Sequence, residues 1–99
     1  MSETLDDATI DQFVSSMDAW QRAGASLQRT ATMASFPEAI QLVDRVAVVA
    51  EELDHHPDMD IRWRTVHISC TTHSAGGLTQ RDLELARRIE PIIASIASP

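Results

Sequence analysis

The chain has 99 residues, of which 43% are hydrophobic, and carries a net charge of −7 from 15 acidic and 8 basic residues. This length and composition predict one folded domain over residues 1–99. All basic residues are arginines and they form no cluster, so we expect neither nucleic acid nor an anionic membrane as a partner. With no ~20-residue apolar run, no secretory signal and a single cysteine, Cys70, the chain is expected to be soluble and cytoplasmic.

The first third of the sequence predicts one helix and two strands. Thr9 and Gln12 form a capping-box pattern, which predicts a helix that begins at Thr9. Residues 20–24 are read as a short strand. Residues 26–34 alternate in hydrophobicity, with Leu27, Arg29, Ala31 and Met33 on one face, and predict a second strand.

A long helix follows over residues 35–53. Ser35 and Glu38 again form a capping box, and apolar residues recur at helical spacing over a stripe wide enough to predict burial on more than one flank. Pro57 ends this helix at or before His56, because a residue before proline avoids the helical region.

The last third predicts two strands, a turn and a helix. Residues 60–63 are read as a strand, and residues 64–72 alternate so that Val66, Ile68 and Cys70 share one face. Residues 74–77 contain two glycines and predict a turn. The final helix begins at Thr79, and Pro91 is expected to kink or split it near Glu90.

The order of these elements predicts the fold class. Pairs of strands alternate with helices in the order helix, two strands, helix, two strands, helix. Such an order favours an α+β two-layer sandwich in which an antiparallel sheet is covered on one face by helices.

Four histidines are the candidates for chemistry: His55, His56, His67 and His73. Three of them, His55, His56 and His73, fall at predicted element ends, where side chains can converge, and histidine exchanges protons near neutral pH. Glu51 lies four residues before His55 and is expected on the same helix face if the helix persists that far.

A metal site and nucleophilic catalysis have less support in the sequence than acid–base chemistry does. The sequence contains no HExxH and no CxxC pattern, so no metal site is predicted. Cys70 falls on the apolar face of its strand, which is typical of a structural cysteine. Acid–base chemistry without a covalent intermediate is the interpretation that remains.

The spacing of these residues resembles the signature of the pterin-4a-carbinolamine dehydratases. The run consists of Glu51, His55-His56-Pro57, Trp63, His73 and Asp82. The likeness implies a four-stranded antiparallel sheet with helices on one face. It also implies the dehydration of 4a-hydroxytetrahydrobiopterin to quinonoid dihydropterin, in tetrahydrobiopterin recycling. The family needs no metal or redox cofactor for this reaction.

The resemblance also implies roles for single residues. His55, His56 and His73 would be the catalytic histidines, with His55 and His73 as the acid–base pair and His56 mainly a hydrogen-bonding residue. Pro57, Trp63, Asp82 and Glu51 would bind or support the substrate.

Each of the other positions has a second interpretation. Trp63 could be a core aromatic, Asp82 only the capping partner of Thr79, and Glu51 a solvated acid. His67 lies outside the signature and is expected on a sheet face.

Two functions stay open at this point. The enzyme is favoured because the signature is complete, and the alternative is a dehydratase-like binding or assembly module that acts on a protein partner. The small core and the family both imply a homodimer or homotetramer.

Overall fold

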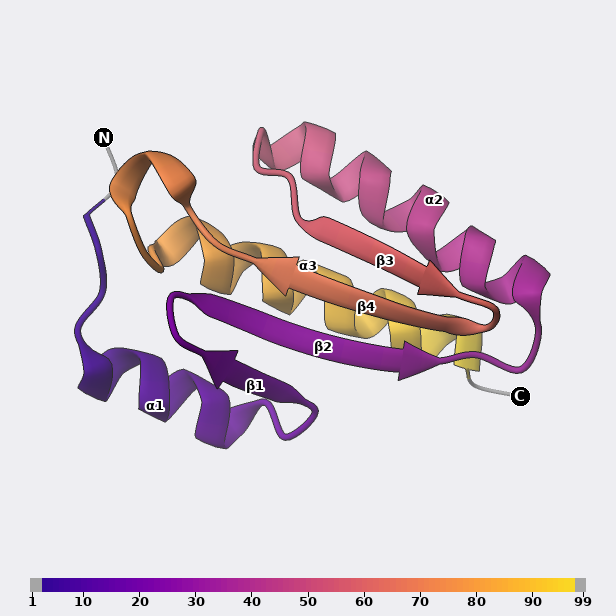
Figure 1. Cartoon of the computed structure of the whole chain (residues 1–99), viewed down its shortest axis with the longest axis horizontal. Helices are drawn as coiled ribbons and strands as arrows, with labels where there is room; N and C mark the ends of the chain where they lie inside the picture. Colours follow the sequence, from indigo (N-terminus) through magenta and orange to yellow (C-terminus); the bar gives the residue numbers. More distant parts are fainter. Residues whose placement is uncertain (1–2, 98–99) are drawn as a thin grey trace.

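The computed structural model describes residues 3–97 and contains four strands, three α-helices and one 3-10 turn (Figure 1). In chain order they are α1 (Asp7–Ser16), β1 (Trp20–Ala23), β2 (Ser26–Thr32), α2 (Phe36–Leu53), β3 (Asp58–Arg62), β4 (Thr65–Cys70), η1 (His73–Ala75) and α3 (Gln80–Ala97). None of the helices in this range combines the length and the hydropathy needed to cross a bilayer.

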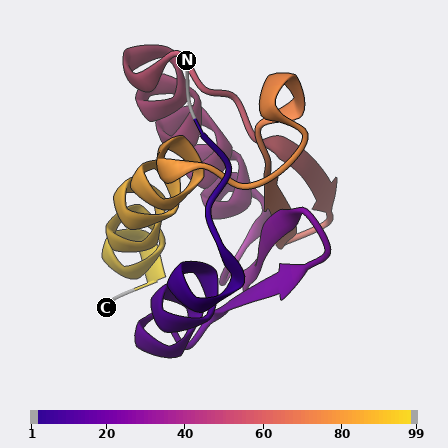
Figure 2. The ribbon, with the colours of Figure 1, turned by 90° about the vertical axis from the view of Figure 1, so that its left-hand side faces the viewer.

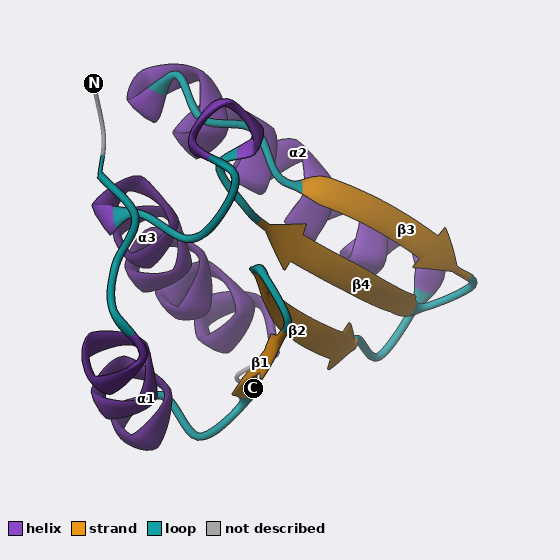
Figure 3. Cartoon of the chain, turned by 60° about the vertical axis from the view of Figure 1, so that its left-hand side comes forward, coloured by secondary structure: helices purple, strands orange, loops and turns teal. Residues whose placement is uncertain are grey.

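The strands form one antiparallel sheet with the order β1-β2-β4-β3. The helices lie on one face of this sheet, and the other face is open (Figures 2 and 3). The predicted α+β two-layer fold is therefore confirmed. Strands β1 and β3 are the two edges.

The alternation along the central strands explains which face is covered. Val66, Ile68 and Cys70 of β4 are buried under the helices, and Leu27 and Ala31 of β2 join them. The residues between them face the open side of the sheet. The predicted faces of both strands are confirmed.

Helix α2 begins as predicted. Its N-cap is Ser35, whose hydroxyl accepts a hydrogen bond from the Glu38 N–H at 3.2 Å. Its buried face is narrower than the predicted apolar stripe, because Phe36 is 48% exposed and Ala47 is exposed as well. The face that packs on the sheet and α3 consists of Ala39, Leu42, Val46, Val49 and Ala50.

Helix α1 begins earlier than the predicted Thr9. The N-cap is Asp6, whose carboxylate accepts a hydrogen bond from the Thr9 N–H at 2.8 Å. The capping-box prediction for Thr9 and Gln12 was wrong, because the aspartate three residues upstream is an equally good cap and adds a charge that favours the helix N-terminus.

Helix α3 is not split at Pro91, so this one of the two predicted effects of the proline was wrong. The helix runs from Gln80 to Ala97 without a break. Pro91 is exposed, so the carbonyl that loses its N–H partner faces water, while Ile89, Ile92 and Ile93 hold the helix on the core.

A polar cluster ties α3 to the first hairpin. Glu90 accepts hydrogen bonds from the Trp20 Nε1–H at 2.8 Å and from the Arg29 Nε–H and Nη2–H at 2.8 and 3.1 Å. The hydrogen bond from Arg29 is the main reason that the pKa of Glu90 is lowered. Glu90 of α3 thus accepts one hydrogen bond from β1 and two from β2, which holds the helix to both strands.

The connections place two groups of residues at opposite ends of the sheet. The α2–β3 connection and the η1 segment lie at the left in Figure 1, and they carry His55, His56 and His73. We call this region, residues 51–58 and 71–79, the histidine end. The β3–β4 turn lies at the right, and we call its residues Arg62, Trp63 and Arg64 the tip.

Candidate active site

The end of α2 decides where the two adjacent histidines point. Asp54 follows the helix in the left-handed conformation, with φ 49°. The His55 N–H donates to the Ala50 carbonyl at 3.0 Å, which closes the turn, and Arg81 Nη2 of α3 donates to the Asp54 carbonyl. This turn sends His55 into the protein and leaves His56 on the surface.

His55 is buried and paired with a buried carboxylate. The residue is only 7% exposed. Its Nε2 lies 2.6 Å from Oδ1 of Asp82, and Asp82 is wholly buried. The other oxygen, Asp82 Oδ2, accepts from Thr72 Oγ1 at 2.7 Å and from the Thr79 N–H at 2.9 Å. These four residues form what we call the buried polar cluster: His55, Thr72, Thr79 and Asp82.

The hydrogen bonds of the cluster fix where its protons lie. A backbone N–H can only donate, and an ionised carboxylate can only accept. As a carboxylate, Asp82 accepts from the Thr72 hydroxyl, the Thr79 N–H and the His55 Nε2–H. With Nε2 as the donor, Nδ1 of a neutral His55 is the nitrogen with a free lone pair. Nδ1 has no hydrogen-bond partner within residues 3–97, so it is the atom that a ligand could reach.

Asp82 therefore has two structural roles. It caps the start of α3 together with Thr79, whose hydroxyl accepts from the Arg81 N–H at 3.2 Å, as the capping-box prediction stated. The same carboxylate also orients His55, which joins two residues that lie 27 positions apart.

Thr72 is a member of the buried polar cluster that the sequence reasoning missed. Its hydroxyl lies 2.9 Å from that of Thr79 and 3.5 Å from His55 Nε2. The signal was present, because Thr72 continues the inward alternation of Val66, Ile68 and Cys70 by one more step.

His56 and Glu51 form a separate, exposed pair. The His56 Nε2 lies 2.5 Å from Glu51 Oε2, and both side chains are more than half exposed. The helix does not persist to His55, the condition under which Glu51 would share a face with it, because α2 ends at Leu53 and the left-handed Asp54 turns His55 away. Glu51 instead orients the second histidine.

His73 is exposed at the start of η1, directly after Thr72. A hollow of about 360 Å³ lies beside it, lined by Ala25, Ser26, Thr71, His73, Gly76 and Gly77. Gly76 closes the turn with φ 74°, a conformation that favours glycine, so the predicted turn over residues 74–77 is confirmed. Thr72 links the two sides of the site, since its hydroxyl contacts the His55 cluster and its backbone leads into His73.

Pro57 and Trp63 have different positions relative to the histidines. Pro57 is half-buried and starts the path into β3 at the histidine end. Trp63 is 72% exposed in the tip, with φ 54°, so the interpretation as a core aromatic was wrong. The five-residue strand β3 separates it from Pro57, and the six residue steps between them span about 20 Å. A single chain therefore does not bring Trp63 to the histidines.

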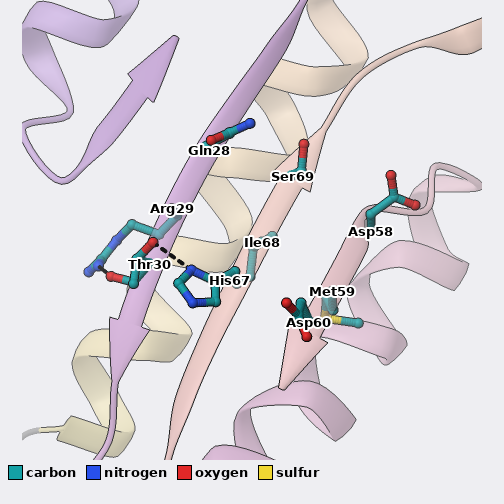
Figure 4. Close-up of a pocket in the computed structure, with 9 residues that line it drawn as sticks. All are labelled: Gln28, Arg29, Thr30, Asp58, Met59, Asp60, His67, Ile68 and Ser69. Carbon is teal, nitrogen blue, oxygen red and sulfur yellow. Dashed lines mark hydrogen bonds between the residues drawn. The ribbon is translucent and has the colours of Figure 1, made fainter. Parts of the chain in front are cut away.

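The open face of the sheet carries a second hollow, of about 230 Å³ (Figure 4). His67 stands in it with Nδ1 3.0 Å from the Thr30 hydroxyl, so the prediction of a sheet-face histidine is confirmed. The remaining lining residues are Gln28, Arg29, Asp58, Met59, Asp60, Ile68 and Ser69. None of the predicted catalytic residues lines this hollow.

Cys70 is a structural residue. It is wholly buried, and burial, together with the charges of Asp82 and Asp58, raises the pKa of its thiol to about 12. A thiol in this state is not nucleophilic near neutral pH. Within residues 3–97 no three histidine, cysteine or acidic side chains converge in a group that could hold a metal ion.

Comparison with known proteins is decisive for the family. The sequence model of the family described as Pterin 4 alpha carbinolamine dehydratase matches residues 3–92. The chain belongs to this family. A Nocardia farcinica protein provisionally named pterin-4-alpha-carbinolamine dehydratase is 52% identical over 91 residues, which cover 92% of this chain and 96% of that protein. A similarly named protein of a Roseiflexus species is 47% identical over 94% of this chain and its own full length.

Solved structures agree with this pterin dehydratase assignment. A Brucella melitensis crystal structure, described as a transcriptional coactivator/pterin dehydratase, matches with a TM-score of 0.88 at 27% identity, over 92% of this chain and 99% of that chain. A pterin dehydratase-like protein, described as a RuBisCO assembly factor of the α-carboxysome, shares the fold, with a TM-score of 0.61 at 19% identity over 75% of this chain and 86% of its own.

Proposed function

We propose that this chain dehydrates a 4a-hydroxytetrahydropterin to the quinonoid dihydropterin, in tetrahydrobiopterin recycling. His55 and His73 are the acid–base pair, and His56 donates or accepts a hydrogen bond at the substrate. Pro57 shapes the approach, while Asp82 and Glu51 orient the histidines. Membership of the pterin dehydratase family supports the reaction class.

One observation carries the assignment of His55. Its Nε2 is bound to the buried carboxylate of Asp82, and its Nδ1 is left without a partner in the described chain. An imidazole held in one tautomer by a buried carboxylate, with the other nitrogen open, is arranged as a general base. A purely structural histidine would be expected to use both nitrogens internally.

The reaction needs one base and one acid. Nδ1 of His55 removes the proton from N5 of the substrate, and the electrons of that N–H bond form the N5=C4a double bond. The C4a–O bond breaks, and the hydroxyl leaves as water after it takes a proton from His73. His73 is exposed beside a hollow, so it regains its proton from solvent, and His55 returns its proton to solvent. Such acid–base catalysis contributes about 10²–10⁴-fold.

A second function has its own support. The Brucella protein is described as a transcriptional coactivator as well as a dehydratase, and the carboxysome relative is described as an assembly factor. A chain with this fold could therefore act on a protein partner.

The test is the dehydration of freshly generated 4a-hydroxytetrahydropterin, followed by the absorbance of quinonoid dihydropterin above the spontaneous rate. Wild type is compared with His55→Gln, whose amide keeps a donor toward Asp82, and with the exposed His73→Ala. His67→Ala is the matched control, because it removes a histidine that lies outside the site.

We expect the first two variants to lose at least about ten-fold in rate and the control to match wild type. A wild-type rate equal to the spontaneous one would contradict the enzyme and favour the binding module. A loss in the control equal to that in His55→Gln would contradict the assignment of the site.

A further inference from the structure

Residues 3–5 run along the loop that carries His73. We call residues 3–5 the strap and residues 71–79 the η1 loop. The strap has no helix or strand of its own, and it leads into Asp6, the N-cap of α1. In Figures 1 and 2 the indigo start of the described chain passes beside the orange η1 loop before it turns into α1. The family signature begins at Glu51, so it assigns no role to the strap.

Two contacts join the strap to the end of the η1 loop. The Leu5 N–H donates to the Leu78 carbonyl at 2.8 Å. The γ-methyl of Thr4 lies beside Gly77, where a Cβ would be only 3.3 Å from it. The Leu5 side chain is half-buried and packs against the hydrophobic core, and Leu78 is buried as well. The strap is therefore docked on Gly77 and Leu78 by its backbone and by both side chains.

The contacts continue from Gly77 to the residues of the site. Gly77 and Thr72 form an isolated bridge, in which the Thr72 N–H donates to the Gly77 carbonyl at 3.2 Å and the Gly77 N–H donates to the Thr72 carbonyl at 3.4 Å. Thr72 precedes His73 in the chain, and its hydroxyl belongs to the buried polar cluster. One bridge and one peptide bond therefore separate the residue under the strap from His73.

The η1 loop is a weak element by itself. η1 has only three residues, and a single 3-10 turn has poor hydrogen-bond geometry. Two glycines follow it, and glycine restricts the backbone least of all residues. His73 is exposed, so the position of its imidazole depends on the backbone that carries it. The Thr71 hydroxyl donates to the Ala25 carbonyl at 2.5 Å and holds the start of the loop, while the strap holds residues near its end.

His55 is held in a different way. Its partner Asp82 lies in α3 and accepts from the Thr79 N–H at 2.9 Å, and neither contact involves the strap. Loss of the strap should therefore loosen His73 and leave the tautomer of His55 as it is. This difference separates an effect on one catalytic group from a general loss of stability.

We propose that the strap is a positioning element of the site, which clamps Gly77 and Leu78 so that the η1 loop holds His73 where it delivers its proton. The structural half of this proposal stands on the contacts of Thr4 and Leu5 alone, and the catalytic half rests on the proposed dehydratase function. A misplacement of about 1 Å in an active site costs about 10²-fold in rate. Because His73 acts in the transition state, loss of the strap lowers kcat and leaves KM unchanged.

The clamp is tested without substrate by Leu5→Pro. Proline has no N–H, so this change removes the hydrogen bond to Leu78. Amide hydrogen exchange should become faster at Thr72 and Gly77, while amides in the centre of β4 keep their wild-type rates. Asp11→Asn, an exposed change on α1, is the control and should exchange as wild type. Unchanged exchange at Thr72 and Gly77 in Leu5→Pro would overturn the clamp.

A second pair of variants acts from the side of the loop. Gly77→Ala pushes its added methyl group against Thr4, and Thr4→Ser removes the γ-methyl that this group meets. Exchange at Thr72 should become faster in Gly77→Ala and return toward the wild-type rate when Thr4→Ser is added. A double variant that exchanges as fast as Gly77→Ala would refute the contact between the strap and the loop.

The catalytic role is tested by kinetics and a double-mutant cycle. In the dehydration assay Leu5→Pro should lower kcat by about ten-fold or more with KM unchanged, and ¹⁵N NMR should still find the His55 proton on Nε2. Because the strap acts through His73, Leu5→Pro should lower the rate no further when His73→Ala is already present. An unchanged kcat, a raised KM, a shifted His55 proton or an additive loss in the double variant would each contradict this role.

The failure of this proposal and that of the proposed function give different results. A wild-type protein that only matches the spontaneous rate would refute the dehydratase function, and the exchange rates would still decide the clamp. An active wild type whose Leu5→Pro variant keeps full activity would refute the catalytic role of the strap and leave the dehydratase function standing.

Discussion

The substitution Asp82→Asn tests the central feature of the site, the carboxylate that orients His55. Asn has the shape of Asp, and its side-chain oxygen can still accept from Thr72 and the Thr79 N–H. Its NH₂ group then faces His55 Nε2 at the position of the present 2.6 Å contact. Two donors cannot bond to each other, so Nε2 must become an acceptor and the imidazole proton must move to Nδ1.

The magnitudes follow from this exchange. A hydrogen bond to a charged group contributes about 1.5–3 kcal/mol and a neutral one about 0.5–1.5 kcal/mol. Asp82→Asn should therefore lower the free energy of unfolding by about 1–2 kcal/mol and leave the protein folded. The base at Nδ1 is blocked, so the dehydration rate should fall by about 10²-fold or more.

The assay combines three measurements on one variant. Urea unfolding gives the free energy, the dehydration assay gives the rate, and ¹⁵N NMR of the imidazole shows which His55 nitrogen carries the proton. Asp11→Asn, which neutralises an exposed acid on α1, is the control and should change none of them. An Asp82→Asn protein that still carries the His55 proton on Nε2, or that keeps the wild-type rate, would refute the reasoning.

Three further substitutions or treatments test the fold. Glu90→Gln should destabilise the protein at pH 7 by about 1 kcal/mol. The pKa of Glu90 is lowered from 4.5 in the folded state, so the carboxylate stabilises the fold above that value and loses its effect as the pH falls through the lowered pKa. The difference from wild type in urea unfolding should therefore shrink in acid, and a difference that grows would contradict the ion pair. Cys70 should resist alkylation at pH 8 until urea unfolds the chain, because burial raises its pKa to about 12, and rapid labelling of folded protein would show that the thiol is accessible. Pro91→Ala should raise the free energy of unfolding by about 1–3 kcal/mol, since the helix already runs through this position. An unchanged or lower stability would mean that the proline is compatible with the helix at no cost.

Local patterns were sufficient for most of the fold. The alternation in β2 and β4 depends on a strand's two faces, and the Ser35 and Thr79 caps depend on groups three residues apart. These are short-range properties that a sequence displays directly. At Thr9 the capping-box rule failed because Asp6 is a competing N-cap. At Pro91 the helix-breaking rule failed because the core packing of α3 outweighed it.

The candidate site also has features that the sequence predicts and features that only the tertiary structure shows. The sequence by itself determined that His55, His56 and His73 fall at element ends, and the spacing of the signature determined the resemblance to the family. Only the tertiary structure decided that His55 turns inward to Asp82 while His56 turns outward to Glu51. The reason is the left-handed Asp54, whose carbonyl accepts a hydrogen bond from Arg81 of α3. Likewise, the sequence places Trp63 in the signature, but the length of β3 separates it from the histidines of its own chain, because an extended strand keeps its two ends apart.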